Sequence, residues 1–169
     1  NNDLGWLKKS KYLNEMEIIL GDIRDYDSVF KSMKGCNIIF HLAALIGIPY
    51  SYISPLAYVK TNVEGTYNVL EAAKNLGSKK VIITSTSEVY GSSQYLPMDE
   101  EHPLNAQSPY AASKTAADQL SLSYFKSFKL PVTIIRPFNN FGPRQSNRAV
   151  IPTIINQVLD KKNKLIVLN

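Results

Sequence analysis

Hydrophobic residues in this sequence gather into short continuous runs that are separated by longer stretches of mixed character. Continuous apolar runs of this length are typical of strands buried in a sheet, and they predict strands at residues 17–20, 37–44, 81–85, 132–136 and 165–168. The intervening stretches predict helices at residues 26–33, 55–76, 109–128 and 149–159. The clearest is 55–76, where apolar residues recur every three or four positions. Gly and Pro mark the remaining stretches, 45–54, 91–107 and 138–147, as loops.

Strands and helices alternate along the whole chain. This order indicates βαβ units, and therefore an α/β fold with a doubly wound parallel sheet, right-handed crossovers and helices on both faces. Such sheets bind ligands outside the carboxyl ends of their strands. We expect Asp22, His41, Thr86 and Arg136 at those ends, so the functional site should lie there.

Charge and composition narrow the choice of partners. The formal net charge is +5, but the lysines lie in scattered pairs without interleaved aromatic residues, so no nucleic-acid partner is expected. The most apolar stretch, 38–49, is interrupted by His41 and Gly47 and is too short to span a bilayer, so no membrane partner is expected. The single cysteine, Cys36, excludes an internal disulfide and suits a cytoplasmic protein. Two isolated histidines and one cysteine predict no metal site.

The candidate chemistry lies at the end of the 81–85 strand and at the start of the 109–128 helix. Tyr110 and Lys114 are four residues apart and share one helix face. Because an ammonium favours a nearby phenolate, we expect Lys114 to lower the pKa of Tyr110 toward the range useful for acid–base catalysis. Thr86 could hydrogen-bond the same substrate hydroxyl. A Tyr and a Lys at this spacing are, on their own, more often part of a solvated helix face.

Taken together, residues 81–91 and 108–114 resemble the extended short-chain dehydrogenase/reductase family, in its nucleotide-sugar branch. Further segments resemble motifs of the same family in the same order: Gly21–Asp25 (G-D-x-x-D), His41–Ala44 (H-x-A-A), Thr61–Thr66 (T-N-x-x-G-T) and Arg136–Pro143 (R-x-x-N-x-Y-G-P). The similarity covers nearly the whole chain. It implies a Rossmann-like fold, NAD as the cofactor with NADP as the alternative, a nucleotide-sugar substrate and a homodimer.

The resemblance also assigns residues to the cofactor. Asp22 matches an Asp that contacts the adenine amine, whereas the ordinary interpretation of this segment is a strand end followed by a helix cap. We expect His41 to be a core histidine, His102 to be a surface residue, and a buried Asn62 to need hydrogen-bond partners and to support the site. The full set expected at the cofactor is Asp22, Ile23, Leu42, Ala43, Ala44, Asn62, Ser85, Tyr110, Lys114 and Pro137.

The choice between reactions depends on the triplet Thr86-Ser87-Glu88. In the family, the position of Thr86 binds the sugar 4-hydroxyl, and 4,6-dehydratases carry at the position of Glu88 a Glu that removes the C5 proton, which oxidation at C4 makes acidic. Epimerases usually carry a non-acidic residue there, whereas UDP-glucuronate decarboxylases share Thr-Ser-Glu. In dTDP-glucose 4,6-dehydratases an Asp replaces Ser87. The resemblance implies that the catalytic residues are Thr86, Glu88, Tyr110 and Lys114, and that the substrate-binding residues are Ser87, Asn139, Arg148 and Val150.

Segments 43–52, 84–91 and 145–152 most resemble 4,6-dehydratases that act on GDP- or UDP-linked N-acetylglucosamine in legionaminic-type sugar synthesis. A UDP-glucuronate decarboxylase and a nucleotide-sugar 4-epimerase are the alternatives within the family. The chain has no Gly-rich phosphate-binding turn, which the family carries in a strand–helix–strand unit ahead of the position of Asn1. We therefore expect residues 1–169 to be a partial dinucleotide-binding domain of a longer protein. Residues 138–169 would begin the substrate-binding part, most of which is absent. A module that binds no cofactor and catalyses nothing is the alternative from another class.

Overall fold

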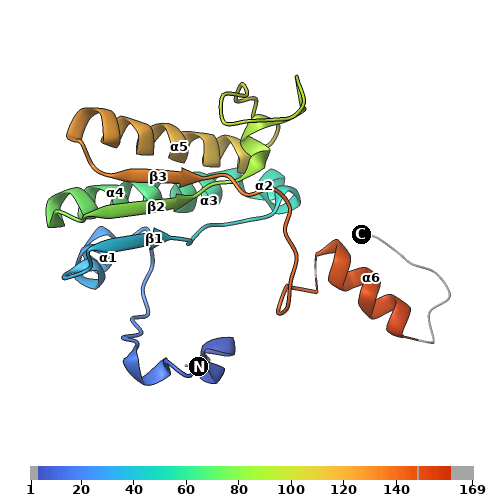
Figure 1. The fold of residues 1–169 in the computed structure, drawn as a ribbon, viewed down its shortest axis with the longest axis horizontal. Coiled ribbons are helices and arrows are strands. Elements are labelled where there is room, and N and C mark those ends of the chain that lie inside the picture. Colours follow the sequence, from blue (N-terminus) through green and yellow to red (C-terminus); the bar gives the residue numbers. More distant parts are fainter. Residues whose placement is uncertain (1–3, 148, 161–169) are drawn as a thin grey trace. The chain divides into compact units, whose positions relative to one another are not determined.

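The computed structural model describes residues 4–147 and 149–160 of the chain (Figure 1). The chain divides into two compact units, Asn1–Arg136 and Pro137–Asn169. The first unit carries the sheet and the helices that pack on it. The described part of the second unit contains helix α6 (Val150–Leu159), as predicted for residues 149–159.

The first unit is built on a parallel sheet. Its described strands are β1 (Ile38–His41), β2 (Lys80–Thr84) and β3 (Val132–Ile135), in that spatial order. Ile39 pairs with Val81, which in turn pairs with Val132 on the other side. Because neighbouring strands run in the same direction, a helical crossover connects each to the next (Figure 1). The predicted α/β fold with a parallel sheet is confirmed.

The main helices of this unit are α1 (Tyr26–Met33), α4 (Gly65–Leu76) and α5 (Pro109–Phe128). Their ends follow from local sequence. The Asp25 carboxylate accepts hydrogen bonds of 3.0 and 3.2 Å from two backbone N–H groups in the first turn of α1. The Ser108 hydroxyl caps α5 in the same way at 3.0 Å. Gly77 ends α4 at φ 67°, in the left-handed conformation that glycine adopts without steric cost.

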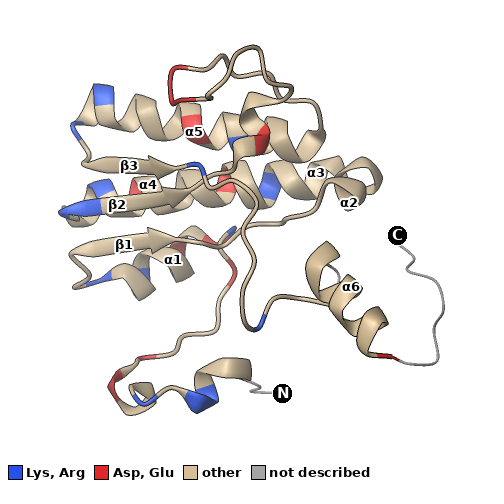
Figure 2. Cartoon of the chain, turned by 45° about the vertical axis from the view of Figure 1, so that its right-hand side comes forward, with Lys and Arg blue, Asp and Glu red and all other residues tan. Residues whose placement is uncertain are grey.

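Helices α1, α4 and α5 lie on one face of the sheet (Figures 1 and 2). Val81 and Ile83 point to that face, are fully buried and form a core with Leu70 of α4. On the other face, Ile38 and Phe40 are 57% and 66% exposed. The described residues therefore supply one of the two helical layers that a doubly wound sheet requires.

Residues 17–20, predicted to be a strand, have no regular secondary structure. Their apolar side chains are exposed, and Leu20 reaches 76% exposure. A strand satisfies its backbone by pairing with a neighbour, and β1 is paired with β2 alone among the described strands. The predicted strand at 165–168 lies outside the described residues.

The segment 45–76 differs from its prediction in two ways. The expected loop contains α2 (Ile48–Ile53), since Pro49 lies in the first turn, where proline is tolerated. The expected continuous helix is divided into α3 (Pro55–Tyr58), a π-helical turn (Val59–Glu64) and α4. Single π-helical turns often occur at functional sites, and this one carries the buried Asn62.

Charged residues are spread over loops, over the ends of helices and strands, and along α4 and α5 (Figure 2). Among the described helices, none combines the length and the apolar character needed to cross a bilayer.

Candidate active site

The candidate site lies where the end of β2 meets the first turns of α5. Lys114 is buried, and its Nζ donates a 2.6 Å hydrogen bond to the backbone carbonyl oxygen of Thr84. Tyr110 lies one turn earlier on α5 and is half-buried. The structure thus places the predicted Tyr–Lys pair against the end of a strand, rather than on a solvated helix face.

Thr86 and Glu88 come to the same place from the other side. Thr86 is the N-cap of a 3-10 helix, Ser87–Tyr90, and its Oγ1 accepts a 3.3 Å hydrogen bond from the backbone N–H of Glu88. The Thr86 hydroxyl and the charge of Glu88 both influence the pKa of the Tyr110 phenol. Thr86, Glu88 and Tyr110 therefore share one electrostatic environment, and Lys114 is anchored one turn further along α5.

The pKa of Tyr110 differs from the prediction. Burial raises it above its ordinary value, the Thr86 hydrogen bond lowers it, and the charge of Glu88 raises it. The predicted lowering by Lys114 was wrong for the protein alone, because the ammonium is directed to the Thr84 carbonyl. Burial also lowers the pKa of Lys114, and the charge of Asp118 opposes that shift.

Asn62 has the predicted supporting role. Its side chain is buried, its Oδ1 accepts from the backbone N–H of Leu45 at 2.8 Å, and its Nδ2 donates to the Leu45 carbonyl at 3.0 Å and to Ser113 Oγ at 2.9 Å. Ser113 lies on α5 between Tyr110 and Lys114. One amide therefore joins the segment that follows β1 to the turn that presents the catalytic pair.

Tyr58 is a site residue that sequence reasoning missed. It is fully buried, and its hydroxyl donates to the carbonyl oxygens of Ile46 and Gly47 at 3.0 and 2.7 Å. Its ring packs edge-on against Tyr110, with centroids 6.1 Å apart. The only signal in the sequence was its place in the apolar stripe of residues 55–76, which does not distinguish a core residue from one that fixes the catalytic phenol.

His41 is a core histidine, as predicted. It is 5% exposed, and its Nε2 lies 2.9 Å from Thr66 Oγ1. The Thr66 hydroxyl donates its one proton to the backbone carbonyl oxygen of Asn62. It therefore accepts the hydrogen bond that His41 Nε2–H donates. Burial, with a smaller effect of the Lys114 charge, lowers the pKa of His41 to about 4.

The prediction that His102 is a surface residue was wrong. His102 is 2% exposed, and its Nε2 accepts a 2.9 Å hydrogen bond from the backbone N–H of Gln94. Its Nδ1 lies 3.0 Å from the Pro103 carbonyl oxygen, and its ring packs edge-on against Tyr90. The polar sequence of 91–107 predicted a loop correctly, but it gave no sign that this histidine holds the loop together.

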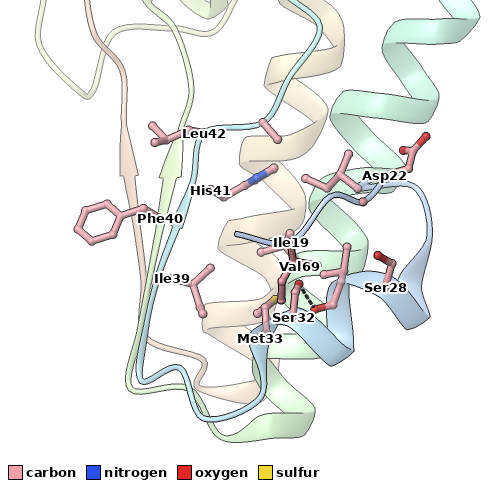
Figure 3. Close-up of a pocket in the computed structure, with 14 residues that line it drawn as sticks. Ile19, Asp22, Ser28, Ser32, Met33, Ile39, Phe40, His41, Leu42 and Val69 are labelled. Atoms are coloured by element: carbon pink, nitrogen blue, oxygen red, sulfur yellow. Dashed lines mark hydrogen bonds between the residues drawn. The ribbon is translucent and has the colours of Figure 1, made fainter. Parts of the chain in front are cut away.

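A cleft of about 310 Å³ lies beside β1 (Figure 3). Figure 3 shows Ile39 and His41 pointing toward the helices, whereas Phe40 points away from them. Four residues predicted to bind the cofactor are among those lining the cleft: Asp22, Ile23, Leu42 and Ala43. The remaining lining residues come from residues 19–33, β1 and α4, so the predicted adenine-side contacts do lie together.

Asp22 has a well-defined electrostatic environment in this cleft. Its carboxylate accepts from the backbone N–H and the Nε of Arg24, both at 2.9 Å, and pairs with Nη2 at 2.5 Å. The side-chain hydrogen bonds from Arg24 lower the pKa of Asp22 to about 2. The Asp22 side chain is 48% exposed and lines the cleft, so its ionised carboxylate is accessible there while it remains paired with Arg24.

The remaining predicted residues lie as follows. Ser85 is buried directly after β2, Ser87 is half-buried two residues later, and Ala44 is half-buried in the segment after β1. Pro137, Asn139 and Val150 belong to the second unit, and Arg148 lies outside the described residues. Among the described residues, no group of three or more His, Cys, Asp or Glu side chains could hold a metal ion.

Comparison with known proteins gives consistent relatives. The dTDP-D-glucose 4,6-dehydratase of Dictyostelium discoideum is 38% identical over 95% of this chain, which spans 39% of that relative. The structure of DesIV, a dTDP-glucose 4,6-dehydratase from Streptomyces venezuelae solved with NAD bound, has a TM-score of 0.78 and is 37% identical over 83% of this chain and 44% of its own. The UDP-N-acetylglucosamine 4-epimerase from Methanobrevibacter ruminantium M1 has a TM-score of 0.86 and is 36% identical, over 95% of this chain and 53% of its own.

The chain therefore spans less than half the length of the first two of these relatives and about half of the third. Its sheet, its helices and the Tyr–Lys arrangement of α5 are those expected of a nucleotide-sugar dehydratase or epimerase. The family model described as GDP-mannose 4,6 dehydratase matches residues 2–168, nearly the whole chain. The chain belongs to the GDP-mannose 4,6-dehydratase family, within the short-chain dehydrogenase/reductases.

Proposed function

We propose that the complete protein is an NAD(P)-dependent nucleotide-sugar 4,6-dehydratase. The observation that carries this proposal is the anchoring of Lys114 at the end of β2, one helical turn from Tyr110, whose pKa responds to the Thr86 hydroxyl and to the charge of Glu88. A phenol and a carboxylate at one place provide two separate acid–base groups. A dehydratase requires two such groups, one for the 4-hydroxyl and one for the C5 proton.

The described residues fit a dinucleotide on two grounds. The cleft beside β1 has the size of a ligand site and is lined mainly by apolar side chains and the small Ala43. At its mouth, Asp22 offers an exposed, ionised carboxylate to an adenine amine or a ribose hydroxyl. When bound, NAD would supply a reversible hydride acceptor for the oxidation at C4 and the reduction at C6. The relative from Streptomyces venezuelae holds NAD, which supports the same cofactor here.

The residues of this chain divide the chemistry. Lys114 stabilises the phenolate form of Tyr110, which takes the proton of the 4-hydroxyl while Thr86 hydrogen-bonds the same oxygen, so that Tyr110 becomes a neutral phenol. Glu88 takes the C5 proton as the C6–O bond breaks and a C5=C6 double bond forms, and it later returns a proton to C5. In balance, the proton of the 4-hydroxyl and the hydroxide from C6 leave as one water, and the product is the 4-keto-6-deoxy sugar.

The preferred substrate is GDP- or UDP-linked N-acetylglucosamine, with Ser87, Asn139, Arg148 and Val150 as its proposed contacts. The similarity to the epimerase from Methanobrevibacter ruminantium, solved with UDP-N-acetylmuramic acid, supports a hexosamine pocket in this part of the family. UDP-glucuronate decarboxylation is the second candidate, because Thr-Ser-Glu is compatible with it. The charge of Glu88 reaches Tyr110, and an acidic residue at this position makes 4-epimerisation the weaker alternative.

The test uses the full-length protein with NAD and, separately, GDP-GlcNAc, UDP-GlcNAc, GDP-mannose, dTDP-glucose and UDP-glucuronate. Mass spectrometry should detect a product lighter by one water, with a ketone at C4. Tyr110→Phe should abolish turnover, whereas Tyr67→Phe, an exposed tyrosine on α4, should not. Loss of carbon dioxide from UDP-glucuronate, a 4-epimer without loss of water, or full turnover by the Tyr110 variant would refute the proposal.

We also propose that the complete protein is a cytoplasmic homodimer in which α4 and α5 face a second copy. The exposed Tyr67, Phe125 and Phe128 on these helices support this interface. Residues 1–169 alone should be inactive and should bind NAD weakly. A non-catalytic module would give the same result for residues 1–169. Light scattering on the full-length protein tests the dimer, and titration of both proteins with NAD separates a partial enzyme from a module that never binds the cofactor.

A further inference from the structure

Behind the site lies a buried ion pair that the proposed chemistry does not use. The Asp118 side chain of α5 is fully buried, and its Oδ2 accepts a 2.9 Å hydrogen bond from Arg136 Nε, directly after β3. The Arg136 side chain is only 14% exposed. Removing two charges from water is costly, and a pair of apolar residues in their place often stabilises a fold equally well or better. The pair is therefore better explained by what it holds in place than by stability.

Arg136 continues from this pair to a tyrosine. Its Nη1 donates a 3.1 Å hydrogen bond to the hydroxyl of Tyr90, and its guanidinium carbon lies 5.1 Å from the centroid of the Tyr90 ring. Tyr90 is 3% exposed and is the last residue of the 3-10 helix Ser87–Tyr90. The planar guanidinium can hold the carboxylate and the phenol at once, which a lysine ammonium cannot do with the same geometry.

The turn that Tyr90 ends is the one that presents Glu88. Three hydrogen bonds at this turn are long: 3.3 Å from Glu88 N–H to Thr86 Oγ1, 3.4 Å from Val89 N–H to the Thr86 carbonyl, and 3.3 Å from Gly91 N–H to the Glu88 carbonyl. Long bonds of this kind restrain a turn weakly. Anchors from outside the turn therefore matter: Asn105 N–H donates a 2.9 Å hydrogen bond to the Val89 carbonyl, and Arg136 bonds the Tyr90 side chain at the carboxyl-terminal end.

We propose that Arg136 is a positioning residue for Glu88, acting through the hydroxyl of Tyr90. Asp118 orients the guanidinium, the guanidinium holds Tyr90, and Tyr90 fixes the turn so that the Glu88 carboxylate faces C5 of the sugar. Tyr110 has further anchors of its own, because Lys114, Ser113 and Tyr58 hold its part of α5, so loss of the Tyr90 anchor should affect Glu88 more than Tyr110. The inference rests on the proposed dehydratase and concerns its second half, in which the C5–H and C6–O bonds break.

The first experiment measures amide hydrogen exchange in the full-length protein without substrate. Tyr90→Phe keeps the ring and removes the acceptor of Arg136, and Arg136→Lys keeps the charge that pairs with Asp118. Both should raise exchange of the amides of residues 88–91 about tenfold, as expected for the loss of one hydrogen bond to a charged group. The matched control is Tyr124→Phe on α5, whose hydroxyl donates to Glu71 Oε2 at 2.7 Å, and it should leave these amides unchanged.

The second experiment separates the two halves of the reaction, with UDP-GlcNAc or whichever nucleotide sugar of the panel the wild-type protein converts. Tyr90→Phe should reduce kcat about tenfold with little change in KM. The isotope effect on kcat should increase for substrate deuterated at C5 and decrease for substrate deuterated at C4, because proton removal by Glu88 becomes limiting. A merely structural defect would slow both halves alike.

The inference is overturned if Tyr90→Phe leaves the exchange of residues 88–91 unchanged, or if it slows the C4 and C5 steps equally. It is also overturned if Tyr90→Phe and Arg136→Lys have additive effects on kcat, since two members of one chain should not act independently. A wild-type protein that converts no nucleotide sugar would refute the proposed function, whereas the exchange experiment would still decide whether Arg136 holds the turn.

Discussion

The ammonium of Lys114 and the backbone carbonyl of Thr84 are joined by a 2.6 Å hydrogen bond. This bond places the Lys114 ammonium at the last residue of β2. Burial at this position disfavours the charged form of the ammonium. Asp118, four residues later on α5, supplies a negative charge that favours the protonated form of Lys114. The bond uses one of the three donors of the ammonium, so the same group can hold the helix and still act on a phenolate or a ligand.

Lys114→Met tests that double role. The substitution keeps the length of the side chain but removes the charge and the donor, so turnover of the full-length enzyme should fall at least about 100-fold. The fold should persist, because a buried ammonium contributes little to stability. The measurements are kcat and the far-ultraviolet circular dichroism of both proteins. Lys126→Met, in the last turn of the same helix, is the control, and an equal loss of turnover in it would assign the effect to α5 in general.

A second prediction concerns the pH dependence of stability through His41. Its pKa is about 4 in the folded protein, against an ordinary value of 6.5. Above pH 6.5 the histidine is neutral in both the folded and the unfolded states and has no effect. As the pH falls from 6.5 toward 4, the unfolded state takes up a proton that the folded state does not, so stability decreases. The full loss is about 3 kcal/mol.

His41→Gln should remove this part of the pH dependence. Urea unfolding of the wild type and the variant at pH 7.5, 6, 5 and 4 gives the comparison, and carboxyl groups that titrate in both proteins cancel in the difference. The variant should be less stable than the wild type at pH 7.5, because the bond to Thr66 changes, and the gap should close as the pH falls. A gap that stays constant with pH would show that His41 is not held neutral.

The sequence was sufficient to predict the parts of the molecule that are determined locally. The strand at β2 and the bounds of α5 follow from an apolar run and from Ser108 with Pro109, and both match. The edge segment 17–20 was predicted wrongly because its apolar pattern depends on a neighbouring strand for its backbone partners. The apolar pattern of this segment does not reveal whether a strand that could pair with it lies among the described residues.

The candidate site was predictable in its identity but not in its electrostatics. The motif put Tyr110, Lys114 and Glu88 together in sequence order, but the raised pKa of Tyr110 depends on burial that spacing does not reveal. The contacts of Tyr58 and His102 were missed as well. Tyr58 packs on Tyr110, which is far away in the sequence, whereas His102 contacts Gln94 and Pro103 within a loop whose polar sequence suggested exposure. Arg136 was expected at a strand end, but its bonds to Asp118 and Tyr90 were not.

Gly91 offers a prediction about the loop that follows the site. It has φ 64°, and a Cβ atom there would lie 2.1 Å from the backbone carbonyl oxygen of Asn105. Gly91→Ala should therefore cost about 3 kcal/mol of unfolding free energy, because backbone must move. Gly77→Ala is the matched control: its φ is 67°, but a Cβ atom would meet nothing within 4 Å. It should cost only the left-handed strain, about 1 kcal/mol. Urea unfolding of both variants measures the difference, and equal costs would mean that the loop yields without strain.

The last prediction concerns Asp22 and the adenine side of the proposed cofactor cleft. Asp22→Asn keeps the shape but removes the ionised acceptor that faces the cleft mouth, so the Kd of the full-length enzyme for NAD should rise about tenfold, while kcat at saturating NAD should change little. Because the pKa of Asp22 is about 2, the wild-type affinity should not change between pH 5 and 8 through this group.

Asp27→Asn, an exposed residue in the first turn of α1, is the control for lost surface charge. Calorimetric titration with NAD gives the Kd values. If Asp22→Asn and Asp27→Asn weaken NAD binding equally, the carboxylate of Asp22 acts only through long-range charge, and its assignment to the adenine contact fails.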